Sequence, residues 1–480
     1  MSTAKGTRFE RFKEVSVDGN VGNEMWKLPV NYYQVIIIGA GMAGIGAALR
    51  LYENGCKNIK ILEAKKEAGG RIKTIPLQNG FIDIGAQWIH GTDNNCLYRI
   101  AKEHNLLSDE MSEEGCGLYI RDDGFVFDSA LVDEVNFELG KIILECEKFI
   151  DESTFPISVG NFLEDKFETY IERSKSDVEM KKELFDWHIK FLLVDNSCSS
   201  LEYVSAKEWG RYNGGPEHVN LKNGYKSLVD VLISMLPNKV LKYSSPVSRI
   251  CWSNNKNCVR LYCVNGEEYD CDHVIVTVSL GVLKDSPNFF QPNLPNKMRE
   301  TIHSMGFYGI AKIFLIYDVK WWNANGFQLV WRRKRKLYGS KKWLRYITGF
   351  DLVYNQPNIL LGWVGGEGVP AMERLTETDI GLHCTELLTR ILNSTVPNPS
   401  KVIRTKWMCS PWVRGGYCHI TPQCDKTNTG PLTLSEPVFV GDVPRILLAG
   451  EACNSKHFST THGAFESGQM QAQRVLDYLK

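Results

Sequence analysis

Segments that would cross a membrane or direct secretion are missing from this sequence. It contains no run of about 18 apolar residues, the length that a membrane-spanning helix needs. The N-terminal stretch MSTAKGTRFERFKEVSVDGN lacks the apolar core of a secretion signal, and the closing VLDYLK is not a peroxisomal Ser-Lys-Leu ending. We therefore expect a cytoplasmic protein that does not associate with membranes.

Paired cysteines are missing as well. The 14 cysteines are scattered singly, without a Cys-x-x-Cys pair. The closest grouping, Cys251, Cys258, Cys263 and Cys271, falls on a strand-rich stretch and lacks the spacing of a zinc site. We expect free thiols in a reducing compartment, with neither disulfides nor a bound metal.

An excess of charge of one sign is also absent. The 56 basic and 56 acidic residues give a formal net charge of +0, and we expect no nucleic-acid partner. With 43% hydrophobic and 23% charged residues, the composition is that of a soluble globular protein. At 480 residues the chain is too long for one ordinary core, so two or three domains are expected.

A polar arm over residues 1–33 leads into QVIIIGAGMAGIGAALRLYENG, which predicts a buried strand, a glycine-rich turn and a helix. Within this turn, which also contains Ala43, Gly39 permits the tight bend, Gly41 lets the backbone approach a pyrophosphate, and Gly44 allows close helix packing. A second strand, NIKILEA, ends on Glu63, 19 residues after Gly44, where a carboxylate can bond ribose hydroxyls. The pattern predicts dinucleotide binding at a helix N-terminus.

Two further segments extend this prediction. In KEAGGRI, Arg71 offers a guanidinium for a second pyrophosphate contact, which favours FAD over NAD. Near the other end, RILLAGEACNSKHFSTTHGAFESGQ predicts a strand ending at Gly450-Glu451, a loop and a helix from about 463. This second polar cradle includes Thr460, Thr461 and Ala464. Strands in YSSPVSRICW, which contains Val247, and in CDHVIVTVSLGVL would complete the nucleotide-binding sheet.

The fold class predicted from these segments is α/β, with a discontinuous FAD-binding domain of the Rossmann type. This domain would comprise residues 34–119, 223–307 and 436–480. The two excursions between them, residues 120–222 and 308–435, would form the substrate-binding domain.

Together the motifs resemble those of the flavin amine oxidase family, and most nearly its animal polyamine oxidase branch. The segments that carry the resemblance are VIIIGAGMAGIGAA, EAKKEAGGRI, DIGAQWIHG, AKIFLIY, WVRGGY and LLAGEACNSKHFSTTHGAFESGQ. The resemblance covers nearly the whole chain from residue 34, and it implies an α+β substrate domain with a mixed sheet flanked by helices. It also implies that hydride leaves the carbon beside an amine nitrogen, that O2 is reduced to H2O2, and that the imine hydrolyses to an aldehyde.

Two residues are the candidate catalytic groups. Lys312, in YGIAKIFLIY, is one amine in an apolar strand, where an unpaired charge is costly. The resemblance implies that it holds a water near flavin N5 and assists reoxidation. His90, in QWIHG, matches the family histidine at the substrate face, where a group titrating near neutrality helps to keep the amine neutral. The alternatives are a lysine that reaches out from an edge strand and a core histidine bonded to the backbone.

The resemblance also assigns the walls of the site. Gln87 and Trp88 would edge the isoalloxazine ring, and Tyr417 and Thr461 would lie beside it. In monoamine oxidases a Gly-Gly-Cys-Tyr sequence carries the flavin covalently, whereas RGGYCHI places Tyr417 at the linking position, followed by Cys418. We therefore expect noncovalent FAD, with Cys418 as a small buried filler.

Two departures from the family concern charge. Polyamine-oxidising relatives carry an acid in a segment resembling KEWGRYNGG, where this chain aligns Arg211, with Glu208 one helical turn earlier. The stretch VWRRKRKLYGSKKWLR, with eight Lys or Arg and no acid, aligns with an acidic hairpin and predicts a hairpin tip that turns at 339–340. If both face the substrate tunnel, they disfavour polycations and favour an acylated or less cationic amine. A solvated surface, or a nuclear address at 332–336, remains open for this stretch.

Three other functions remain open. An L-amino acid oxidase would use a cation such as Arg211 to pair with the substrate carboxylate. The chain could bind FAD after losing catalysis, although Lys312 and His90 argue against this. A chromatin enzyme resembling the lysine-specific histone demethylase is disfavoured because no heptad-rich insertion is present. The partners expected for the favoured function are a small amine and O2, in a monomer or weak homodimer.

Overall fold

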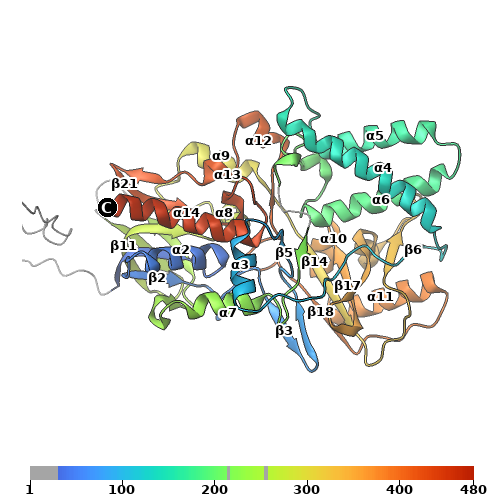
Figure 1. Cartoon of the computed structure of the whole chain (residues 1–480), viewed down its shortest axis with the longest axis horizontal. Coiled ribbons are helices and arrows are strands. Elements are labelled where there is room, and N and C mark those ends of the chain that lie inside the picture. The colour runs from blue at the N-terminus through green and yellow to red at the C-terminus, as the bar shows by residue number, and fades with distance from the viewer. Residues whose placement is uncertain (1–30, 213–216, 253–257) are drawn as a thin grey trace, which may run out of the picture.

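The computed structural model describes residues 31–212, 217–252 and 258–480. Two large sheets organise these residues, and each has its own helices (Figure 1). The helices and mixed sheets confirm the predicted α/β class. The first sheet lies toward the left of Figure 1, and the second lies toward the right, beneath a layer of long helices.

The first sheet has the strand order β12–β9–β10–β11–β1–β2–β8, with β21 beside β11 and β20 beside β21. Its strands are β1 (Tyr32–Ile38), β2 (Ile59–Leu62), β8 (Leu241–Lys242), β9 (Val247–Cys251), β10 (Val259–Cys263), β11 (Glu268–Val276), β12 (Phe290–Gln291), β20 (Val438–Val440) and β21 (Val443–Leu448). Strand β1 pairs in parallel with β2 and β11, and Val35–Ile38 is buried, as a β-branched run in a parallel sheet should be.

Two helices, α2 (Met42–Glu53) and α14 (Thr461–Leu479), pack against each other on this sheet (Figure 1). Their backbones approach so closely that a Cβ added at Gly468 would lie 1.9 Å from the Ala43 carbonyl oxygen. Only glycine fits at such a contact. The beginning and the end of the chain therefore share one helical layer, which brings the two predicted nucleotide segments together.

The second sheet is mixed and has the order β18–β14–β17–β16–β15–β6. Its strands are β6 (Leu118–Arg121), β14 (Ala311–Ile316), β15 (Phe327–Val330), β16 (Ile347–Val353), β17 (Gln356–Val364) and β18 (Lys401–Arg404). All neighbours pair antiparallel except β15 and β6, which are parallel. Strand β14, which carries Lys312, is buried along nearly its whole length.

Helices cover the second sheet from two sides (Figure 1). On one side lie α4 (Ser129–Glu147), α5 (Val159–Arg173) and α6 (Val178–Asp195), which share a core with β15 through Val330. On the other lie α10 (Gly368–Glu373) and α11 (Glu377–Leu392), which pack on Ile313, Leu315 and neighbouring apolar residues. The long helix α6 ends at Asp195, and this end points toward the space between the two sheets.

Short elements occupy the region between the large sheets. Three two-stranded ladders are formed by β3 (Thr74–Leu77) with β4 (Gly80–Asp83), β5 (Ile89–His90) with β7 (His218–Val219), and β13 (Gly306–Phe307) with β19 (Cys418–His419). The remaining α-helices are α3 (Cys96–Glu103), α7 (Lys226–Ser234), α8 (Leu280–Asp285), α9 (Asn296–Ser304), α12 (Pro422–Thr427) and α13 (Pro431–Leu434). The three ladders carry much of the site described below.

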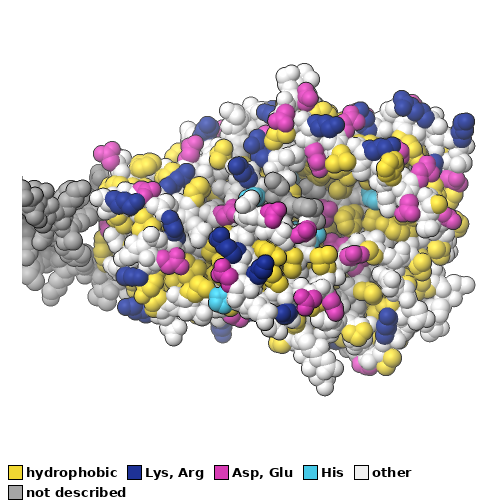
Figure 2. All heavy atoms as spheres, viewed as in Figure 1, with side chains coloured by type: hydrophobic (Ala, Val, Ile, Leu, Met, Phe, Trp, Pro, Cys, Tyr) yellow, Lys and Arg dark blue, Asp and Glu magenta, His cyan; other side chains and the backbone are white. Residues whose placement is uncertain are grey.

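The cysteines are all free thiols, most of them buried. Within the described residues, no group of three or more His, Cys, Asp or Glu side chains is arranged to hold a metal ion. No helix in the same part of the chain combines the length and the apolar character needed to cross a membrane. Acidic and basic side chains are interspersed over the face seen in Figure 2.

Candidate active site

One cavity of roughly 1250 Å³ reaches from β1 and β2 of the first sheet to β14 and β17 of the second. At one end it is lined by the glycine-rich turn after β1, and at the other by Lys312, Trp363 and the end of α6. A single space therefore joins the predicted nucleotide cradle to the predicted catalytic lysine.

The nucleotide end is built on the turn between β1 and α2. Gly39 has a φ of +103°, which side-chain-bearing residues rarely adopt, and Gly41 caps α2 without a capping side chain. A Cβ at Gly41 would meet nothing within 4 Å, so open space lies above the helix N-terminus. Gly41 and Ala43 line the cavity, whereas Gly44 lies beneath, where a Cβ would be 1.9 Å from the Gly39 carbonyl oxygen. The uncapped helix start and the open space fit a pyrophosphate.

Glu63 is buried at the end of β2 and lines the same end of the cavity. Its two carboxylate oxygens accept the backbone N–H groups of Ala40, at 2.7 Å, and Lys65, at 2.8 Å. These bonds fix the plane of the carboxylate and leave a lone pair on each oxygen. The geometry fits an acceptor for ribose hydroxyls.

Arg71 connects the two chain ends at the cavity wall. Its Nη1 donates to the Gly416 carbonyl oxygen at 2.6 Å and to Glu451 Oε1 at 2.9 Å. Glu451 Oε2 also accepts the Cys418 backbone N–H at 3.2 Å. Arg71, Glu451 and the 416–418 loop are thus locked together, and the remaining guanidinium nitrogens are available for a phosphate.

The start of α14 forms the opposite wall of the nucleotide end. Thr460 caps this helix by accepting the Gly463 N–H at 2.9 Å, and the Thr461 hydroxyl contacts the Tyr225 hydroxyl. Thr460, Thr461, Ala464 and, from β9, Val247 all line the cavity. With Glu63 and Arg71, these residues surround a space whose donors and acceptors fit FAD.

Lys312 lies at the other end of the cavity with its side chain 5% exposed. Its ammonium donates to the carbonyl oxygens of Asp83, at 3.0 Å, and Gly85, at 2.7 Å, and to the amide oxygen of Gln87. Burial lowers the pKa of Lys312 to about 8, while the carboxyls of Asp83 and Glu114 act in the opposite direction. The lysine is a donor held by three fixed oxygens, not a side chain that reaches out from an edge strand.

His90 lies on β5, beside Trp88, and both line the cavity. Its Nδ1 is 3.1 Å from Nδ1 of His218, a residue that the sequence interpretation did not select. Burial, and then His218, lower the pKa of His90 to about 4. His90 is therefore neutral at physiological pH, which corrects the expectation of a group that titrates near neutrality. A neutral imidazole nitrogen can accept a hydrogen bond from an amine N–H.

The sequence interpretation missed two acids in the cavity wall, Glu114 and Asp195. Burial raises the pKa of Asp195 to about 7, and burial followed by Asp195 and Asp351 raises that of Glu114. The Asp195 side chain has exposed surface, and it lines the cavity. Glu114 Oε1 is buried without a hydrogen-bond partner among the described residues. No periodicity marks either acid, because each becomes part of the cavity only through the tertiary fold.

Aromatic side chains form the walls between these polar groups. Trp88 stacks on Trp363 with ring centroids 6.2 Å apart, and Lys312 Nζ lies 4.7 Å from the Trp363 centroid. The Tyr417 hydroxyl donates to the Val194 carbonyl oxygen at 2.8 Å, which fixes the ring in the wall. Rigid rings of this kind exclude water around a reacting amine.

Glu208 lines the cavity, but Arg211 does not. The Arg211 guanidinium instead pairs with Glu208 Oε2, and this carboxylate balances its charge outside the cavity. The proposed contact between Arg211 and substrate therefore has no counterpart in the geometry. Because Arg211 forms its ion pair with Glu208, it is also poorly placed to bind the carboxylate of an amino acid.

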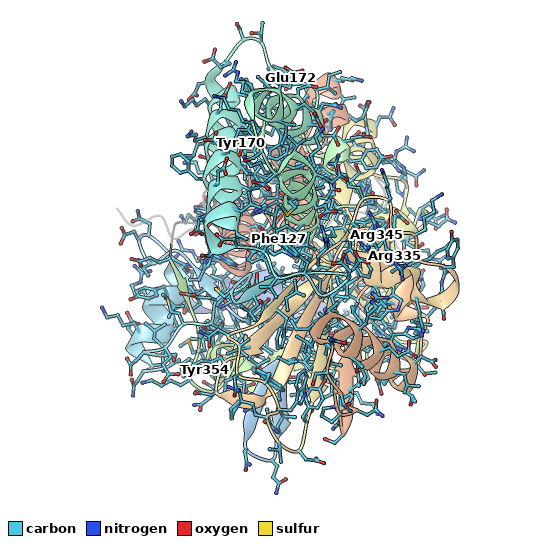
Figure 3. The ribbon with its side chains drawn as sticks, turned by 90° about the vertical axis from the view of Figure 1, so that its right-hand side faces the viewer. Phe127, Tyr170, Glu172, Arg335, Arg345 and Tyr354 are labelled. Atoms are coloured by element: carbon cyan, nitrogen blue, oxygen red, sulfur yellow. The ribbon has the colours of Figure 1, made fainter. Side chains whose placement is uncertain are left out.

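The basic stretch at 330–345 contributes no residue to the cavity. Strands β15 and β16 do pair antiparallel around it, but residues Gly339–Tyr346 form a 3-10 helix instead of a hairpin tip. Arg332 pairs with buried Asp122 at 3.1 Å, and Arg333 pairs with Asp186 at 2.6 Å. Figure 3 shows Arg335 and Arg345 together at the end of the molecule, where Arg345 donates to the Arg335 carbonyl oxygen at 2.8 Å. The stretch therefore does not face the cavity, which favours the alternative of a solvated surface.

Comparison with known families gives one match over most of the chain. Residues 42–476 match the family described as flavin containing amine oxidoreductase. The match includes the catalytic lysine candidate, the histidine pair and both ends of the cavity.

The individual relatives have low sequence identity to this chain. The human peroxisomal N(1)-acetyl-spermine/spermidine oxidase is 29% identical over 92% of this chain and 94% of its own length. The Arabidopsis thaliana probable polyamine oxidase 5 is 28% identical over 93% and 98%. Among solved structures, a putrescine oxidase redesigned in its cofactor binding superposes with a TM-score of 0.70 at 16% identity, over 93% of this chain and 99% of its own. That last likeness concerns the fold alone.

Proposed function

Because the chain belongs to the flavin containing amine oxidoreductase family and uses FAD as its cofactor, we propose that it oxidises a small polyamine-like amine with O2. The products would be H2O2 and an imine, which water hydrolyses to an aldehyde and a shorter amine. The observation that carries the proposal is the pair of acids, Glu114 and Asp195, in the wall of the same cavity as Lys312 and His90.

The acids suit a substrate with more than one amino group. Six carboxyl side chains of the cavity wall come from beyond the nucleotide end, namely Glu113, Glu114, Glu147, Asp195, Glu208 and Glu217. The cationic side chains of the wall are Lys65, Arg71 and Lys312, of which the first two lie at the nucleotide end. An ammonium near Asp195 would favour the ionised form of its carboxyl. The basic stretch outside the cavity offers no opposing charge.

The remaining groups have separate roles around the reacting nitrogen. Bound FAD supplies the acceptor for the hydride of the carbon beside this nitrogen. His90 Nε2, which makes no hydrogen bond within the described residues, would accept a hydrogen bond from the N–H of the neutral amine and orient the lone pair that the reaction needs. Trp88, Trp363 and Tyr417 would orient the substrate and exclude water. Lys312 would hold a positive charge where oxygen is reduced.

A screen of the purified full chain tests this function. Hydrogen peroxide would be followed with polyamines, acetylated polyamines, monoamines and L-amino acids, each at several pH values. We expect turnover of polyamines or their acetylated forms and little turnover of monoamines and amino acids. Turnover confined to amino acids would support the alternative oxidase, and no turnover of any amine by protein with bound flavin would overturn the proposal.

A further inference from the structure

The contact between His90 and His218 joins two nitrogens that cannot both donate. The two residues face each other in the β5–β7 ladder, and their rings stand at 82° with centroids 4.6 Å apart. Trp88 packs beside both rings, with centroids 6.4 Å from His90 and 6.1 Å from His218. At an Nδ1–Nδ1 distance of 3.1 Å the nitrogens share one hydrogen.

Sharing one hydrogen links the protonation of the two rings. A neutral imidazole carries its proton on one nitrogen and a lone pair on the other, whereas an imidazolium carries protons on both. If His90 donates from Nδ1, its Nε2 has a lone pair. If His218 donates from Nδ1, His90 must accept at Nδ1 and carry its own proton on Nε2. The partner thus decides whether the cavity-facing nitrogen of His90 accepts or donates.

The two rings differ in their access to solvent. His218 is exposed, whereas His90 is partly enclosed by the cavity wall, and burial lowers the pKa of His90 to about 4. Solvent reaches the ring of His218, and a proton added to this ring leaves both of its nitrogens protonated, so that its Nδ1 must donate to His90.

We propose that His218 is a positioning residue that sets the tautomer of His90 and so makes amine oxidation depend on pH. This inference rests on the proposed function, in which the amine meets His90 Nε2. With His218 neutral, His90 can donate from Nδ1 and accept a hydrogen bond from the amine N–H at Nε2. When one proton enters from solvent, the shared hydrogen belongs to His218 and His90 carries its proton on Nε2. The acceptor for the amine is then lost.

Neighbouring charged groups do not replace His218 in this role. Glu217 precedes it, and its carboxylate accepts the Thr92 hydroxyl at 2.8 Å. On α14, burial and then His457 and His90 lower the pKa of His462 to about 3, so His462 remains neutral. His457 itself contacts Glu466 at 2.8 Å. Asn95 holds the strand by donating to the His90 carbonyl oxygen at 2.8 Å, and it does not titrate.

Nitrogen NMR of the full chain, labelled with ¹⁵N in its histidines, tests the tautomer directly. The His90 and His218 signals would be assigned with the variants His90→Asn and His218→Asn. A pH titration of wild type, with FAD bound and without substrate, should show His90 Nε2 changing from unprotonated to protonated as His218 gains its proton. A His90 tautomer that stays constant through the titration of His218 would overturn the proposal, whatever the protein oxidises.

Kinetics provide the second readout. For the best amine found, kcat/KM of wild type, corrected for the ionisation of the amine itself, should fall about tenfold per pH unit below the midpoint of the His218 titration. In His218→Asn this fall should disappear, while in His104→Asn, a matched change of an exposed histidine on the end of α3, it should remain. An unchanged acid limb in His218→Asn would contradict the proposal. Absence of turnover would instead count against the proposed function, since the NMR result stands without it.

Discussion

The Lys312 ammonium lies 4.7 Å from the centre of the Trp363 ring while it donates to the carbonyl oxygens of Asp83 and Gly85. A cation over an aromatic face and against fixed carbonyl dipoles is stabilised without a carboxylate in direct contact. This arrangement keeps a positive charge inside the protein next to the space where the amine and oxygen would react.

Replacing Lys312 by Met should slow the reoxidation of reduced protein by O2 about 100-fold, because the stabilising charge is lost. Stopped-flow mixing of photoreduced protein with oxygenated buffer measures this rate without any amine. In wild type the rate should fall as the pH rises past about 8, where Lys312 loses its proton, and the variant should not show this fall. Lys334→Met, on the exposed basic stretch, is the control. Reoxidation within twofold of wild type would remove the role given to Lys312.

Binding of a diamine should release protons near neutral pH. The pKa of Asp195 is about 7, so roughly half of these carboxyls are protonated at pH 7, and an adjacent ammonium lowers the pKa. Under anaerobic conditions, the heat of diamine binding should therefore depend on the ionisation enthalpy of the buffer. In Asp195→Asn the dependence of the binding heat on the buffer should shrink. The KM for the diamine should also rise about tenfold, because the variant loses a partly screened pair of charges. Asp186→Asn, which disturbs only the Arg333 pair, should change neither quantity.

Neutralising the exposed part of the basic stretch should leave substrate affinity unchanged. Exposed charges that do not line the cavity contribute only a few tenths of a kcal/mol to the free energy of substrate binding. A triple change of Lys334, Lys336 and Lys342 to Gln should therefore alter KM for a diamine by less than twofold. A clear fall in KM at low salt would instead restore the idea that this stretch repels polycations.

The Arg332 side chain of the same stretch has a structural role. Arg332→Gln should lower the free energy of unfolding by about 1–3 kcal/mol, because it weakens the pairing of the buried Asp122 carboxylate. Denaturant unfolding followed by fluorescence measures the difference. Lys336→Gln serves as the comparison, and equal stability of the two variants would contradict the assignment.

The flavin should be released when the protein is unfolded. Tyr417, at the position that carries the flavin in covalent relatives, has its hydroxyl bonded to the Val194 carbonyl oxygen, and Cys418 is buried beside Ser459. After acid precipitation we expect the yellow absorbance in the supernatant. Absorbance that stays with the precipitate would show a covalent link.

The nucleotide half of the site was predictable because its chemistry is local. A strand, a turn and a helix place Gly39, Gly41 and Glu63 within one continuous segment, and the structure finds each at the cradle. Lys312 was predictable for a related reason, since a lone amine in an apolar strand is conspicuous in the sequence.

The amine-binding half was less accessible to sequence reasoning. Glu114 lies in the chain well after β5, and Asp195 is the last residue of the long helix α6. Only the packing of α6 onto the second sheet brings the two acids into the wall of the same cavity. The contact of His90 with His218 depends on pairing across a two-residue ladder between distant segments. Charge alone misled the prediction at Arg211 and the basic stretch, because their partners Glu208, Asp122 and Asp186 are known only from the fold.

The link between Arg71, Glu451 and the 416–418 loop has a consequence for how substrate reaches the cavity. Moving the two halves of the molecule apart would separate Arg71 from the Gly416 carbonyl oxygen. Arg71 would keep Glu451, but the backbone acceptor would lose its partner. We therefore expect the two halves to stay closed during turnover, so that amine and product must pass along a fixed channel. The diameter of that channel, and not a hinge, would then limit how branched a substrate can be.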